Sequence, residues 1–277
     1  MLLLSRTAVG QSLRAGWRFA GLHTSRIALE EAALDRAERL KSRFWKTVSL
    51  SPPSSECDGF RVLLDNRAIR TPGGQTIVVP RERELLATCM AQEWNEQDKV
   101  LKPHALPLTS LAARALDACS DSSERVGIQA DLLRYLENET ICFQETQPKA
   151  LVELQEQHWQ PLLAHVNQTY GVKITPFTGL LGNTHAPGTL DTFATHLAKL
   201  DHFDLAAFER SVMLTKSFLI SLGLVSRHLS VEQAAQAAEV EVQSQINRWG
   251  AVEDSHDVDQ AEMRRTLGSV AITTLRN

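Results

Sequence analysis

The spacing of apolar residues changes along this chain of 277 residues, from a repeat of two to a repeat of between three and four. Between residues 44 and 80 apolar and polar side chains alternate, as at Phe60, Val62 and Leu64. Such alternation is typical of strands with one buried face. From residue 121 onward the apolar residues recur at helical spacing. The succession of the two patterns predicts an α+β protein.

The alternating segment predicts a β-meander. Asp65-Asn66 marks a hairpin, because both residue types tolerate positive φ, and residues 71–74 mark a second turn. A lone meander cannot bury both faces, so we expect a covering helix over about residues 82–97. Trp94 lies one turn beyond Met90 on the apolar side of that helix. We therefore predict Trp94 as a structural anchor.

The remainder of the chain predicts a helical bundle. Residues 212–225 are apolar nearly all round, which indicates one central buried helix too short to span a bilayer. Residues 230–249 carry an apolar stripe over five turns, with Ser230 and Gln233 at capping-box spacing. This pattern predicts a single helix. Pro161 interrupts the helical pattern of residues 151–170 and should split or kink it.

We divide the chain into residues 1–40, a targeting segment and flexible arm; 41–118, a small α+β domain of a β-meander with covering helices; and 119–277, an all-α helical-bundle domain. The first 29 residues contain four arginines, several serines and threonines, and no acid. This composition is typical of a mitochondrial targeting sequence and predicts a location in the matrix. No apolar run reaches 18 residues, so we expect no membrane insertion.

The acidic residues are concentrated in one segment. The net charge is −4, but residues 232–262 hold eight acidic residues against one arginine. A general nucleic-acid binder would instead carry a basic domain, so no nucleic-acid partner is expected. A concentrated acidic surface attracts a basic partner. This segment is therefore a candidate binding surface.

Motifs for known chemistry are missing from the sequence. It contains no P-loop pattern, no GxGxxG and no HExxH, and its four cysteines form no CxxC pair, so we predict no cofactor and no metal site. Two carboxylate pairs remain, at Glu239 with Glu241 and at Glu253 with Asp254. Such pairs can catalyse hydrolysis when they converge in a cleft. The sequence does not show convergence, and a solvated helix face is the simpler interpretation.

Several separated motifs resemble one family. They are Arg43–Lys46, Val62–Pro72, Glu93-Trp94, Pro107–Thr109 with Ala112 and Asp117, Trp159 with Pro161–Leu163, and Glu241 with Gln243 and Arg248–Gly250. In this order they resemble the mitochondrial and α-proteobacterial assembly chaperone for the α subunit of the ATP synthase catalytic head. Asn66 departs from the glycine expected in the hairpin, although asparagine also accepts positive φ.

The resemblance implies a protein with no catalytic residues that transiently binds the free α subunit and shields its β-binding surface. It also implies a monomer when free. We predict a partner-binding site of Glu239, Glu241, Trp249, Glu253 and Asp254; Glu241 lies in a resembling motif, and the others follow from the charge pattern. Trp249 could instead anchor a helix end in the core, and Glu241 could pair internally. The alternative functions are a small matrix hydrolase or transferase using a carboxylate pair, and a permanent accessory subunit of a respiratory complex.

Overall fold

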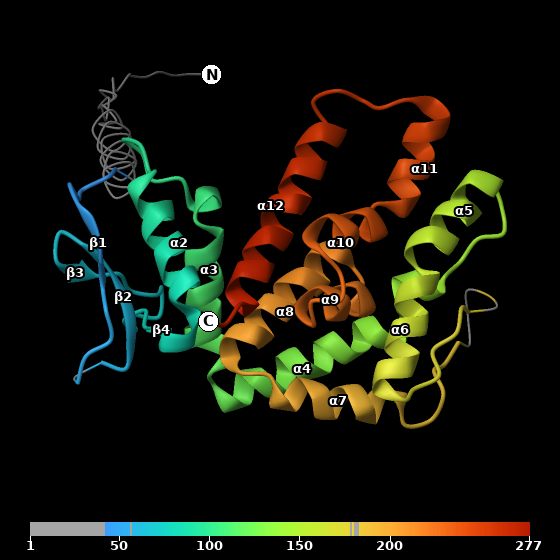
Figure 1. Cartoon of the computed structure of the whole chain (residues 1–277), viewed down its shortest axis with the longest axis horizontal. Coiled ribbons are helices and arrows are strands. Elements are labelled where there is room, and N and C mark those ends of the chain that lie inside the picture. The colour runs from blue at the N-terminus through green and yellow to red at the C-terminus, as the bar shows by residue number, and fades with distance from the viewer. Residues whose placement is uncertain (1–41, 56, 178, 180–182) are drawn as a thin grey trace, which may run out of the picture. The chain divides into compact units, whose positions relative to one another are not determined.

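The computed structural model describes residues 42–55, 57–177, 179 and 183–277 (Figure 1). The predicted targeting segment lies outside these residues. Residues 44–97 and 102–277 belong to one compact unit. Ser42, Arg43 and residues 98–101 belong to a second, in which the Arg43 N–H donates to the Lys99 carbonyl. The domain boundary expected near residue 118 stays a prediction.

The described chain begins with strands and continues with helices, which confirms the predicted α+β class (Figure 1). The strands are β1 Val48–Ser51, β2 Gly59–Leu64, β3 Arg67–Ala68 and β4 Val79–Pro80. The helices are α2 Glu84–Asn95, α3 Pro107–Arg114, α4 Ser122–Glu137, α5 Lys149–His158, α6 Gln160–Tyr170, α7 Thr189–Lys199, α8 His202–Thr215, α9 Phe218–Val225, α10 Val231–Ala238, α11 Val240–Trp249 and α12 His256–Thr274. Within the part of the chain described here, no helix is long and apolar enough to cross a membrane.

The sheet is antiparallel, with β2 paired to β1, β3 and β4. The predicted hairpin joins β2 to β3, and both Asp65 and Asn66 have positive φ. The Asp65 carboxylate accepts hydrogen bonds from the backbone N–H groups of Lys46 and Thr47. These bonds hold the pKa of Asp65 below its usual value and tie the hairpin to the segment that leads into β1.

Helix α2 covers the sheet as predicted, because it contacts β1, β2 and β4. Leu86 and Met90 of α2 and Val62 and Leu64 of β2 are buried. Alternation along the strand and helical spacing in α2 thus supply the two sides of one core. This placement agrees with the period of two in the sequence.

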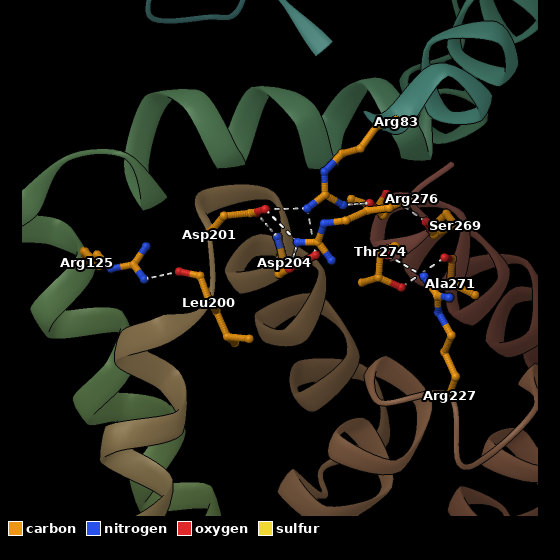
Figure 2. Close-up of polar contacts among 11 residues, drawn as sticks. Arg83, Arg125, Leu200, Asp201, Asp204, Arg227, Ser269, Ala271, Thr274 and Arg276 are labelled. Atoms are coloured by element: carbon orange, nitrogen blue, oxygen red, sulfur yellow. Dashed lines mark hydrogen bonds and ion pairs between the residues drawn. The ribbon is translucent and has the colours of Figure 1, made fainter. Parts of the chain in front are cut away.

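A buried arginine links the start of α2 to the helical part of the chain (Figure 2). Arg83 has no exposed surface, and its guanidinium lies 2.6 Å from Asp201 and 2.8 Å from Asp204. The same group donates to the Thr273 carbonyl at the end of α12. Arg276 binds both aspartates from a second side. Two guanidiniums and two carboxylates therefore neutralise one another around the buried side chains of Arg83 and Asp204, while Arg276 and Asp201 remain partly exposed.

The central apolar segment is two helices, which corrects the prediction of one helix over residues 212–225. Lys216 has a φ of 58°, so α8 ends there, and the Ser217 side chain caps α9. Glu139, fully buried, accepts hydrogen bonds from the Ser217 hydroxyl and from the Leu219 N–H at 3.0 Å. A buried carboxylate 78 residues away in sequence thereby supplies acceptors that the start of α9 needs.

Helices are interrupted at two further places, of which the sequence predicted one. Helix α5 ends at His158 and α6 begins at Gln160, with Pro161 in the first turn of α6, which confirms the predicted split. The single helix predicted over residues 230–249 is wrong. This segment consists of two helices, α10 and α11, because Glu239 leaves the helical conformation with φ −99° and ψ 10°. The capping box of Ser230 and Gln233 is present as predicted.

Replacing Arg83 by leucine should lower the free energy of unfolding by about 3–5 kcal/mol, because the change leaves the buried Asp204 carboxylate without one of its two counter-charges. The control is Arg81→Leu, since Arg81 pairs with Asp58 while both side chains are largely exposed. We expect that control to unfold like the wild type in urea. Equal midpoints for both variants would contradict a structural role for the buried cluster.

Burial raises the pKa of Glu139 to about 7, against the hydrogen bonds from Ser217 and Leu219. A carboxyl whose pKa is raised by folding stabilises the fold at low pH, and this contribution is lost as pH rises through the folded pKa. Between about pH 4.5 and pH 7, wild type should therefore lose stability relative to Glu139→Gln, by on the order of 3 kcal/mol. Urea unfolding across this range measures the difference. A difference that does not vary with pH would contradict the prediction.

Candidate functional site

Helix α11 buries little of its surface. Of its ten residues only Val240 and Ser244 are buried, and the helix contacts α5. Glu241 is exposed, Val242 is 39% exposed and Trp249 is 71% exposed. The apolar stripe of residues 230–249 had placed Val242 and Trp249 toward a core. The break at Glu239 explains the difference, because it allows α11 to take a different direction from α10.

Glu239 differs from the other carboxylates of the predicted site because it forms an ion pair within the fold. Its side chain is 13% exposed and lies 3.3 Å from Arg264 of α12. Arg264 also binds Glu232 of α10 at 2.8 Å. Burial raises the pKa of Glu239, and the positive charge of Arg264 opposes that rise. Glu239 therefore holds the α10–α11 junction against α12, and its carboxylate is only partly available to a partner.

The turn from α11 to α12 is exposed and carries both acidic and apolar side chains. Gly250 ends α11 with a φ of 88°, and Asp254 has a φ of 61°. Glu253 and Asp254 are exposed, as are Val252 at 60% and Val258 at 59%. We call the exposed residues of this region the α11 surface: Glu241, Val242, Trp249, Val252, Glu253, Asp254 and Val258.

The α11 surface combines large apolar groups with carboxylates that have no partner within the fold. Among the described residues, Glu241, Glu253 and Asp254 make no side-chain hydrogen bond or ion pair. The Trp249 ring lies 5.0 Å from the Arg248 guanidinium, which holds a cation over its face. Exposed tryptophan and unpaired carboxylates suit recognition of an apolar surface flanked by basic side chains.

The sequence identified the acidic residues of this surface but not its valines. Val242 matched a core stripe, while Val252 and Val258 belonged to no periodic pattern. Their exposure depends on the tertiary position of α11, for which residues 230–260 contain no local signal. The charge pattern and the motif that contains Glu241 were therefore the signals in the sequence that pointed to this surface.

The two carboxylate pairs do not meet in the cavity beside α11. Glu239 lines a cavity of about 250 Å³ between α5, α10, α11 and α12, and Glu241, Glu253 and Asp254 are not among its lining residues. Across the described ranges, no group of three or more His, Cys, Asp or Glu side chains could hold a metal ion.

Comparisons with known proteins give one consistent result. A family model described as ATP12 chaperone protein matches residues 42–167. "Protein atp12, mitochondrial" of Schizosaccharomyces pombe is 33% identical over 238 residues, covering 83% of this chain and 81% of that protein. "Protein ATP12, mitochondrial" of Saccharomyces cerevisiae is 28% identical, covering 87% and 86%. The crystal structure of Atp12 from Paracoccus denitrificans is similar with a TM-score of 0.73 and 27% identity, covering 85% of this chain and 100% of that one.

The two tryptophans predicted as functional or structural should differ in their effect on stability. Trp94 is partly buried, lies 5.1 Å from the Trp45 ring and donates to the Thr109 hydroxyl at 3.0 Å. Trp94→Ala should therefore cost about 2–4 kcal/mol of unfolding free energy. Trp249→Ala should leave the thermal midpoint near that of wild type. Comparable losses in both variants would show that Trp249 is a core residue in solution.

Proposed function

This chain belongs to the ATP12 chaperone family, and on that premise we propose that it binds the free α subunit of mitochondrial ATP synthase and shields the surface to which the β subunit later binds. A subunit that awaits its partner exposes a large apolar interface, which is prone to aggregation. A chaperone that covers this interface must bind tightly enough to protect it. It must also be displaced when the β subunit arrives.

The exposure of Trp249 within the acidic α11 surface is the observation that carries the proposal. Tryptophan is enriched among the residues that dominate binding energy at interfaces. Carboxylates around an apolar centre increase the rate of encounter with a basic partner and disfavour acidic ones. Glu241 and Trp249 are the residues we assign to contact the client, with Glu253 and Asp254 at the edge of the contact. Glu239 contributes by positioning α11 through Arg264.

The proposed location is the mitochondrial matrix, where the α subunit would be met after import. It is supported by the basic, acid-free composition of residues 1–29 and by the relatives from two yeasts that are named mitochondrial. We propose that the protein acts by binding alone, as a monomer and without cofactor. Glu239 lines a cavity from which Glu241 is absent, and this separation supports action by binding over a carboxylate-pair hydrolase or transferase.

Charge reversal at one exposed carboxylate tests the proposal. Glu241→Lys should weaken capture of purified free α subunit by at least about fivefold, because an attraction becomes a repulsion. Its thermal midpoint should match that of wild type, since Glu241 is exposed. The matched control is Glu137→Lys, an exposed acid at the end of α4, which should capture normally.

Two results would contradict the proposal. Normal capture by a folded Glu241→Lys variant would remove Glu241 from the site. Retention of this chain in assembled ATP synthase, in amounts matching the other subunits, would indicate a permanent accessory subunit. Addition of the β subunit to the preformed complex should release the chain, and a competition assay measures that release.

A further inference from the structure

A groove on the sheet side of the protein has a chemical character opposite to that of the α11 surface. It has a volume of about 610 Å³, within the range of sites that accept large apolar groups. Its lining residues come from the segment before β1, from β2 and β3, from the turn that follows β3, and from α2. They are Phe44, Leu64, Arg67, Ala68, Ile69, Arg70, Thr76 and Trp94.

The aromatic side chains of the groove pack against one another and against buried Trp45. Phe44 is 72% exposed, and its ring lies 5.0 Å from that of buried Trp45. Trp45 in turn lies 5.1 Å from Trp94, whose indole N–H donates to Thr109. Only the outermost ring of this series is left largely to solvent. A large exposed phenylalanine on a fixed aromatic support is typical of a contact point for another molecule.

The charge of the groove is positive. Arg67 and Arg70 are exposed, and none of the lining residues is acidic. The Arg67 side chain makes no hydrogen bond or ion pair with the described part of the chain, and the Arg70 side chain makes one long bond of 3.4 Å to the Gly74 carbonyl. Asp65 is close in sequence, but its carboxylate accepts from Lys46 and Thr47. Both guanidiniums are therefore available to an external carboxylate, which Arg binds in a bidentate manner.

We propose that this groove is a second client-binding site, which takes a polypeptide segment with large apolar side chains flanked by carboxylates. The apolar chain enters between Phe44, Trp94 and Ile69, and the carboxylates meet Arg67 and Arg70. Charge complementarity decides the occupant, because a basic segment suited to the α11 surface would be repelled here. That the bound segment belongs to the α subunit rests on the proposed function, whereas the preference of the groove for acidic apolar segments does not.

Peptide binding to the full chain tests the groove independently of the client. The probe is a fluorescein-labelled peptide in which glutamate and leucine alternate, and anisotropy reports its binding. Matched peptides carry lysine for glutamate or serine for leucine. The double variant Arg67→Glu/Arg70→Glu should bind the first peptide at least about fivefold more weakly than wild type. The control Lys173→Glu/Lys199→Glu changes net charge equally at two exposed lysines away from the groove and should bind normally.

Four results of the peptide assay would overturn the proposal. They are no binding of the glutamate–leucine peptide by wild type, equal binding by the two double variants, equal binding of the serine peptide, and binding to phosphatidylserine vesicles without binding to the peptide. Thermal unfolding of each double variant confirms that it is folded. If the Arg67→Glu/Arg70→Glu variant alone fails to fold, Phe44→Ala replaces it in the assay. This variant should also bind the glutamate–leucine peptide more weakly than wild type.

Capture of free α subunit separates this inference from the proposed function. Weak capture by the Arg67→Glu/Arg70→Glu variant, with normal capture by the lysine control, supports both. Normal capture by both double variants removes the groove from client binding and leaves the α11 surface as the site. Failure of wild type to capture α subunit, with intact peptide binding, overturns the proposed function and the identity of the client but not the groove's preference for acidic apolar segments.

Discussion

A guanidinium cannot lose its contact with water unless other groups neutralise it, and this requirement governs how the chain is assembled. Arg83 lies just before α2, while Asp201 and Asp204 lie at the start of α8 and Thr273 near the end of α12. Segments separated by more than 100 residues must therefore meet at one point before the charge of Arg83 is satisfied (Figure 2). The sheet-covering helix α2 and the helices α8 and α12 depend on the same cluster.

The predictions from sequence succeeded where a local rule decides the structure. Alternation predicted the sheet, tolerance of positive φ predicted the turn at Asp65 and Asn66, and the missing N–H of Pro161 predicted a split. They failed at the breaks after α8 and α10. Distant partners contribute to both breaks, because Glu139 accepts hydrogen bonds from the cap residue Ser217 and from the Leu219 N–H, and Glu239 is paired with Arg264. An apolar pattern that continues across such a break contains no sign of it.

The candidate site shows the same division between local and distant causes. Clustered carboxylates were evident from the sequence, since charge can be counted residue by residue. The sequence predicted Trp249 as a partner-binding residue but left a core position open, because the choice depends on the direction that α11 takes after Glu239. The sequence contains no signal for the groove beside β3 for a related reason: Arg67 and Arg70 are separated by buried Ile69, and Phe44 and Trp94 come from other segments. With an acidic surface on α11 and a basic groove on the sheet, one client could be recognised through two opposite charge preferences.

The shallow packing of α11 has a consequence for how long a complex lasts. A helix that buries only Val240 and Ser244 opens at a smaller free-energy cost than the core around α8, so its amide hydrogens should exchange with solvent long before those of α8. Binding a client would order α11 and slow that exchange. Local opening of the same helix would, conversely, weaken the contact with the bound client. The rate at which α11 opens would then set the lifetime of the complex, while the rest of the protein remains folded.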